Sequence, residues 1–179
     1  MNLNYFIAMW IVFVSCSAFR EAPNTATSHP STNTSINTWP LKSSLSSKEE
    51  LRLNIIELSK HFLGRKYRSG GKSPQTGFDC SGFTGYLFGT HNVNLSASSS
   101  SQIFDGNSKS INDLEPGDLV FFARSPGGRI FHVALVTNID NIGIHVIHST
   151  NSNGVIETNI SKDAYWAPKL VGARDVIGN

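Results

Sequence analysis

Length, composition and charge allow one folded domain and give no support to two classes of protein. The chain has 179 residues, of which 39% are hydrophobic, and a formal net charge of +2 at pH 7. A chain of this length has room for one domain with a sizeable core and some appendages. So small a charge excess supports neither a nucleic-acid-binding protein nor an acidic tail.

Residues 1–16 are predicted to be an export signal that ends at a lipidation site. Tyr5 to Val14 is a continuous apolar run, too short to cross a bilayer and typical of the apolar part of such a signal, although no basic residue precedes it. Residues 13–16, Phe-Val-Ser-Cys, resemble a bacterial lipoprotein cleavage box, with Phe where leucine is usual. We therefore expect a lipid on Cys16; ordinary secretion, with cleavage near Ala18, is the alternative.

Residues 17–46 are predicted to be a disordered tether. From Glu21 to about Ser46 the sequence is dominated by Ser, Thr, Asn and Pro and has no apolar periodicity. Such a segment has too little apolar surface to fold. We therefore expect the folded domain over residues 47–179, held away from the membrane by the tether.

Residues 77–83, Gly-Phe-Asp-Cys-Ser-Gly-Phe, contain the candidate nucleophile Cys80. Apolar residues at 83, 86 and 87 follow helical spacing, which predicts that Cys80 lies in the first turn of a buried helix. The helix dipole there favours a thiolate by roughly 0.3–1 kcal/mol, which is less than about one pKa unit. Asp79 opposes this effect, so activation of the thiol requires an imidazolium from elsewhere in the chain.

The cysteine count supports a reactive thiol at position 80. If Cys16 is lipidated or removed with the signal, Cys80 has no disulfide partner in an exported chain. An unpaired cysteine in an oxidising compartment is either a liability or a reactive thiol that is kept for its chemistry. A Cys16–Cys80 disulfide is the alternative.

A capped helix before the cysteine segment and a series of strands after it predict the fold class. Residues 46–49, Ser-Ser-Lys-Glu, fit a capping box, so the first helix starts at Ser46 or Ser47, and Gly64 is its natural stop. A weaker helical pattern follows over residues 96–107. Strands are predicted over 119–122, 132–136, 143–149, 154–160 and 170–177. Helices followed by strands in short hairpins predict an α+β fold, with an antiparallel sheet of about five or six strands packed against the cysteine helix.

Two neighbouring predicted strands carry the candidate bases. His132 begins one strand, and His145 and His148 share the next. Because they are three residues apart, His145 and His148 point to opposite faces of the sheet. Both faces have apolar neighbours, so alternation does not choose between them. If the sheet brings His132 over Cys80, one of these two histidines would orient its far ring nitrogen.

A zinc site is the rival to a cysteine–histidine pair. Cys80, His132 and His148 would leave one coordination position open, as catalytic zinc requires. However, the chain has no H-x-x-x-H or C-x-x-C pattern. We therefore expect neither a metal nor another cofactor.

Four blocks of sequence resemble the NlpC family of bacterial cell-wall cysteine peptidases. They occur in the family's order and are residues 77–83 (GFDCSGF), 114–122 (LEPGDLVFF), 132–136 (HVALV) and 147–150 (IHST). Together they lie within residues 47–177, the predicted folded part. The resemblance implies a compact papain-like α+β domain that cleaves the short peptide stems of peptidoglycan.

The resemblance also implies a role for each site residue. Cys80 is the nucleophile, His132 is the general base, and His148 is the third polar residue, which holds His132 by a hydrogen bond. Tyr67 matches a tyrosine beside the nucleophile, and its hydroxyl would join the Cys80 backbone N–H in stabilising the oxyanion. The segment from Tyr67 to Cys80 is one residue longer than the family pattern, and the hairpin between His132 and His148 is somewhat longer as well.

Two residues beside the nucleophile each have two interpretations. Asp79 is either the N-cap of the cysteine helix or a contact for a substrate ammonium group, and the cap is favoured. Ser81 is either a first-turn residue or a substrate contact.

The function implied is that of a cysteine endopeptidase acting on peptidoglycan stem peptides. The expected protein is a monomer that binds no nucleic acid and is anchored to a membrane through Cys16, facing the cell wall; it is secreted if Cys16 is not lipidated. Two alternatives are a papain-like acyltransferase acting on lipids and a non-catalytic, lipid-anchored wall-binding module.

Overall fold

A computed structural model describes residues 46–177 of the chain. The predicted export signal, its lipidation site Cys16, and the predicted tether as far as residue 45 lie outside the described residues. None of the helices between residues 46 and 177 is long and apolar enough to cross a membrane.

Helix α1 (Ser47–Lys60) begins where the capping box predicts. The Ser46 hydroxyl accepts the N–H of Glu49 at 3.2 Å, and the Glu49 carboxylate accepts the N–H of Ser46 at 2.8 Å. The helix ends at Lys60, before the predicted stop at Gly64. The chain turns over residues 61–64 because the N–H of Gly64 donates to the carbonyl of Val155 in the sheet, at 2.9 Å.

Helix α2 (Cys80–Gly89) carries the cysteine as its first residue, as predicted. It follows a small two-stranded sheet made of β1 (Lys72–Ser73) and β2 (Gly77–Phe78). A short helix, α3 (Ser99–Gln102), occupies part of the segment with the weaker helical pattern.

Six strands form one antiparallel sheet in the order β3-β8-β4-β5-β6-β7. They are β3 (Asn107–Lys109), β4 (Leu119–Ala123), β5 (Ile130–Asp140), β6 (Gly143–Thr150), β7 (Gly154–Asn159) and β8 (Leu170–Asp175). Two 3₁₀ turns, η1 (Ile111–Asp113) and η2 (Ala167–Lys169), lie in the connections. The α+β class and the strand number agree with the prediction, and β3 is the strand that the sequence pattern missed.

The hairpin between β5 and β6 is tighter than predicted. Strands were predicted over residues 132–136 and 143–149, but β5 continues to Asp140 and only two residues connect it to Gly143. The Asp140 carboxylate accepts the N–H groups of Ile142 and Gly143 at 2.8 and 3.1 Å. Because this side chain closes the turn, the backbone on either side of it stays paired as strand.

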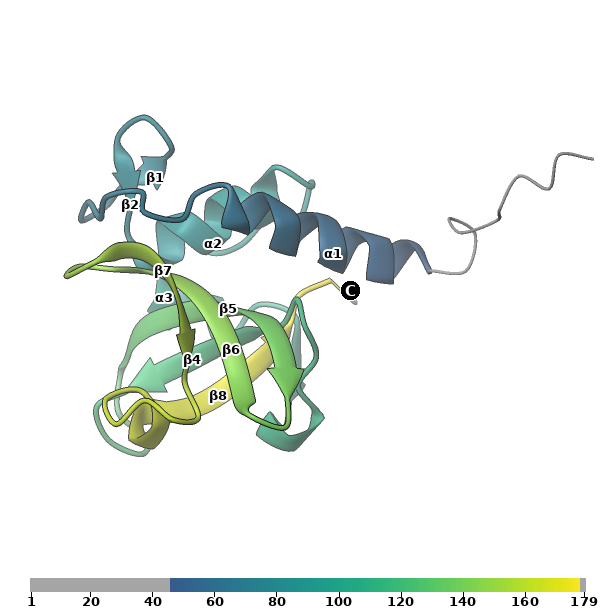
Figure 1. Ribbon diagram of the computed structural model, residues 1–179, viewed down its shortest axis with the longest axis vertical. Coiled ribbons are helices and arrows are strands. Elements are labelled where there is room, and N and C mark those ends of the chain that lie inside the picture. The colour runs from purple at the N-terminus through teal and green to yellow at the C-terminus, as the bar shows by residue number, and fades with distance from the viewer. Residues whose placement is uncertain (1–45, 178–179) are drawn as a thin grey trace, which may run out of the picture. The chain divides into compact units, whose positions relative to one another are not determined.

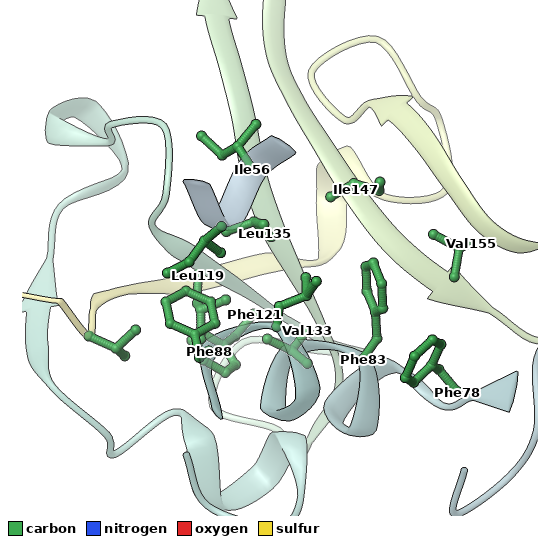
Figure 2. Packing of buried hydrophobic residues seen from close by; sticks show 13 residues of the cluster. Ile56, Phe78, Phe83, Phe88, Leu119, Phe121, Val133, Leu135, Ile147 and Val155 are labelled. Carbon is green, nitrogen blue, oxygen red and sulfur yellow. The ribbon is translucent and has the colours of Figure 1, made fainter. Parts of the chain in front are cut away.

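The main core lies between the helices and one face of the sheet. Figure 1 shows α1 and α2 on the same side of the sheet, and α2 packs on β5 and β6. Figure 2 shows Phe83 and Phe88 of α2 among Phe121, Val133 and Ile147 of the strands. Alternate residues of the same strands form a second apolar cluster on the opposite face, which includes Val120, Phe122, Ala134, Val136 and Val146.

A buried ion cluster connects α1 to the sheet. The Arg52 guanidinium lies 2.8 Å from the carboxylates of both Asp118 and Asp175, and Lys109 lies 3.0 Å from Asp118. The Arg52 side chain is 8% exposed and that of Asp118 is 0% exposed. A charge buried so deeply is tolerated only when it is paired, and Arg52 and Lys109 supply the cations that Asp118 needs in the turn that leads into β4.

Candidate active site

The structure places Cys80 at the N-terminus of α2 and caps that helix with Asp79. The Asp79 carboxylate accepts the N–H groups of Gly82 at 2.7 Å and Gly70 at 2.9 Å, and the hydroxyl of Ser81 at 3.1 Å. The cap predicted for Asp79 is therefore confirmed. Ser81 is a buried first-turn residue whose hydroxyl donates to this cap.

A close backbone contact holds the start of α2 in place. The carbonyl of Gly71 accepts the N–H of Asp79 at 3.0 Å. A Cβ atom added at Gly82 would overlap this same carbonyl oxygen. This close contact with the loop at Gly71 positions the first turn of α2 and its cysteine.

His132 and His148 form a buried hydrogen-bonded pair on neighbouring strands. Nε2 of His132, on β5, lies 2.9 Å from Nδ1 of His148, on β6. The two residues are 7% and 0% exposed. His145 lies instead near the end of the hairpin, with its Nε2 3.3 Å from the Asp140 carboxylate. The hydrogen bond to His132 thus comes from His148, the residue that the family resemblance indicated, and not from His145.

Aromatic rings enclose the histidine pair. The Trp166 ring centroid lies 4.6 Å from that of His132 and 5.0 Å from that of His148. Trp166 also stacks on Phe131, with an interplanar angle of 15°, and meets Phe122 edge-on at 4.9 Å. Sequence reasoning missed Trp166 because the segment before η2 has neither helical nor strand periodicity.

His148 has a second partner that sequence reasoning also missed. Its Nε2 lies 3.0 Å from Oγ1 of Thr158, on β7. In the sheet register His148 pairs with Ile156, and Thr158 lies two residues further along β7, on the same face of the sheet as Ile156. Strand alternation is the only feature of the sequence that places Thr158 on that face. Neither residue type nor spacing marks this threonine as part of a site.

The candidate nucleophile Cys80 lines two cavities. One has a volume of about 530 Å³, and its lining includes Tyr67, Cys80, His132 and Thr158. The other, of about 500 Å³, is lined partly by Tyr67, Asp79, Cys80 and Ser81. Cys80 and Tyr67 border both. The structure therefore brings the predicted residues Tyr67, Cys80 and His132 to one cavity and Asp79 and Ser81 to the adjoining one.

The thiol of Cys80 is held in its neutral form. Burial raises its pKa, and the Asp79 carboxylate raises it further. The backbone N–H of Val133, the residue after His132, makes a hydrogen bond to the sulfur that opposes this effect, as do the N–H groups of the first turn of α2. The pKa of the Tyr67 hydroxyl is also raised, first by burial and then by the negative charges of the Cys80 thiolate form and of Asp79, so this hydroxyl remains a proton donor.

The two imidazoles are likewise uncharged at neutral pH. Burial lowers the pKa of His132 to about 3, and the neighbouring His148 contributes to the shift. Burial lowers the pKa of His148 to about 4, an effect that Asp163 partly offsets. We predicted an imidazolium beside the cysteine, but the buried site disfavours that charge at rest. His132 is instead neutral, and its Nε2 is the ring nitrogen that is hydrogen-bonded to His148.

Within residues 46–177, no group of three or more His, Cys, Asp and Glu side chains is arranged to hold a metal ion. The arrangement offers a thiol, a neutral imidazole, a hydroxyl and the backbone N–H groups of a helix start around shared cavities. Such a set is suited to nucleophilic acyl transfer.

Comparison with known proteins identifies the family. The model of the NlpC/P60 family matches residues 64–175, which is more than half of the chain. The chain belongs to the NlpC/P60 family. Its fold is the papain-like α+β domain of that family. An NlpC/P60 family protein from Bacillus cereus has a similar structure, with a TM-score of 0.65 and 30% identity over 70% of this chain and 40% of that one.

Other NlpC/P60 proteins extend this likeness. The NlpC/p60 domain of the peptidoglycan hydrolase SagA gives a TM-score of 0.58 at 28% identity, covering 69% of this chain and 97% of that domain. Gamma-DL-glutamyl hydrolase of Bacillus subtilis is 36% identical over 124 residues, 68% of this chain and 29% of the hydrolase. The bifunctional muramidase/DL-endopeptidase CwlT of the same organism is 30% identical over 141 residues, 75% of this chain and 38% of its own length. The chain therefore spans less than two fifths of the length of these two relatives.

Proposed function

We propose that this chain is a cysteine endopeptidase that hydrolyses peptide bonds in the stem peptides of peptidoglycan. The observation that carries the proposal is that Cys80 and His132 line one cavity, with His132 hydrogen-bonded to the buried His148 behind it. The names of the relatives, among them a DL-endopeptidase and a peptidoglycan hydrolase, support the substrate class. We further propose that the protein acts outside the cytoplasm, tethered to a membrane by a lipid on Cys16.

In the proposed reaction, the proton of the Cys80 thiol moves to Nδ1 of His132, and the thiolate attacks a stem-peptide carbonyl. The Cys80 backbone N–H and the Tyr67 hydroxyl stabilise the oxyanion, because both are donors at the cavity that Cys80 borders. The His132 imidazolium then protonates the leaving amine, and the acyl group remains on the sulfur as a thioester. Water hydrolyses the thioester with His132 as the base, which restores the thiol.

Burial of the pair explains why proton transfer is coupled to substrate attack. A neutral thiol and a neutral imidazole coexist without charge in the closed site, so the thiolate forms as its negative charge passes to the substrate. His148 lowers the cost of the new imidazolium because one of its ring nitrogens accepts the N–H on Nε2 of His132.

The test is digestion of purified peptidoglycan, followed by mass spectrometry of the released muropeptides. We expect the wild-type chain to release fragments with new amines on their stem peptides and Cys80→Ala to release none. His148→Ala should lose most activity, whereas His145→Ala should retain it. His145 is a matched control, since it lies on the same strand but pairs with Asp140. Activity that survives Cys80→Ala overturns the covalent mechanism. Acyl transfer to a lipid without new amines would identify an acyltransferase, and binding without turnover would identify a wall-binding module.

A further inference from the structure

A chain of hydrogen bonds extends from His132 through His148 to Thr158. His132 Nε2 lies 2.9 Å from His148 Nδ1, and His148 Nε2 lies 3.0 Å from Thr158 Oγ1. Three adjacent strands, β5, β6 and β7, supply these three residues. Thr158 also borders the cavity that holds Cys80.

The position of each proton in this chain determines whether His132 can act as a base. To accept a proton on Nδ1, neutral His132 must carry its own proton on Nε2. That N–H donates to Nδ1 of His148, so the proton of His148 is on Nε2, where it donates to the Thr158 hydroxyl oxygen. The reverse direction, in which Thr158 donates, puts a proton on Nδ1 of His132 and blocks it as a base.

The proton taken from Cys80 selects one of these directions. Once His132 is an imidazolium, both of its nitrogens carry protons, and His148 can only accept. Its own N–H then needs an acceptor at Thr158 Oγ1, because an unpaired N–H in a buried site is costly.

We propose that Thr158 is a positioning residue for the reaction proposed above, on which this inference rests. Its hydroxyl accepts the Nε2–H of His148 and so keeps the Nδ1 lone pair of His132 available to the thiol of Cys80. The charged or titratable groups that act on His148 here are His132, on β5, and Asp163, in the segment after β7. Asp163 is itself held by the backbone N–H groups of Tyr165 and Trp166, at 2.8 and 3.0 Å.

The test compares Thr158→Val with Thr158→Ser in the full chain. Valine has the same shape without the hydroxyl, whereas serine keeps the acceptor. We expect Val to lower both the rate of Cys80 alkylation by iodoacetamide at pH 7 and kcat/KM for muropeptide release by at least about tenfold, which corresponds to 1.4 kcal/mol. Ser should stay within a few-fold of wild type. Peptide mass spectrometry separates Cys80 from Cys16.

The pH profile distinguishes positioning from a loosened site. Loss of the acceptor makes His132 harder to protonate, so the acid limb of the alkylation rate should move to lower pH in Thr158→Val. Entry of water would move it to higher pH, toward the ordinary imidazole value. Two-dimensional ¹H–¹⁵N spectra should show His132 and His148 with their protons on Nε2 in the wild type.

Three results overturn the proposal: unchanged alkylation in Thr158→Val, equal loss in Thr158→Ser, or a proton on Nδ1 of His132. Alkylation and the spectra do not require turnover. They therefore test Thr158 even if the chain releases no muropeptides, a result that would instead refute the proposed function.

Discussion

Acidification from pH 7 to pH 5 is expected to remove about 4 kcal/mol from the free energy of unfolding through His132 and His148. Each imidazole has its ordinary pKa of 6.5 in the unfolded chain, whereas burial in the folded state lowers these pKa values to about 3 and about 4. Between the folded and unfolded values the unfolded chain binds more protons, so stability rises with pH. The contribution is complete above pH 6.5 and is lost as the pH falls toward the folded values.

The magnitude follows from the unfolded pKa. At pH 5 protonation stabilises each unfolded imidazole by about 2 kcal/mol, at 1.36 kcal/mol per pKa unit, and at pH 7 by only about 0.2 kcal/mol. The folded imidazoles stay almost unprotonated at pH 5, because their pKa values of about 3 and about 4 lie below it. The two histidines together therefore account for about 4 kcal/mol, a large part of the stability of an ordinary domain.

Urea unfolding followed by circular dichroism at pH 7, 6 and 5 measures this loss. The informative quantity is the slope of the unfolding free energy with pH, since substitution of a buried histidine also changes stability at every pH. His148→Asn removes one titrating group, so the slope should fall by about half. The reasoning is refuted if the unfolding free energy changes by less than about 1 kcal/mol between pH 7 and pH 5, or if His148→Asn leaves the slope unchanged.

Three further predictions concern packing. Gly82→Ala should lower the unfolding free energy by more than about 1 kcal/mol, despite the better helix propensity of alanine. Gly89→Ala in the same helix should not lower it, because a Cβ added there meets nothing within 4 Å. Equal effects of the two substitutions in urea titrations would contradict the overlap at Gly82. Arg52→Met should lower the unfolding free energy by about 3–5 kcal/mol, because it leaves buried Asp118 without its closest cation. Lys60→Met, which breaks an exposed pair with Glu57, should lower it by less than about 1 kcal/mol. Similar melting temperatures for the two variants would argue against a stabilising role of the buried cluster. Trp166→Ala should raise the pKa of both His132 and His148 toward 6.5, because removal of the ring exposes them to water. NMR titration measures these pKa values, and unchanged values would show that Trp166 does not shield the two histidines from solvent.

Local signals account for the parts of the fold that the sequence predicted. The capping box at Ser46 and the N-cap at Asp79 act over three residues, so their hydrogen bonds form wherever those residues start a helix. Runs such as Leu119–Phe122 are apolar on both faces and lie in a buried strand, as expected. Element ends were less predictable. The hairpin depends on two hydrogen bonds accepted by the Asp140 carboxylate, and the early end of α1 on the bond from Gly64 to Val155; periodicity registers neither.

The amino-acid pattern was sufficient to predict the main helices, five of the six strands of the large sheet in their order, the position of Cys80 at a helix start, and the family. The family resemblance implied that His148 contacts His132, but strand alternation did not choose between His148 and His145. The folded structure alone shows that Trp166 lies against both rings and that Thr158 bonds His148. The reason is physical: alternation along a strand assigns a side chain to a face, but its neighbours across the sheet depend on register and on bulges between strands. The pKa values of the two buried imidazoles depend on this enclosure, and no local pattern contains it.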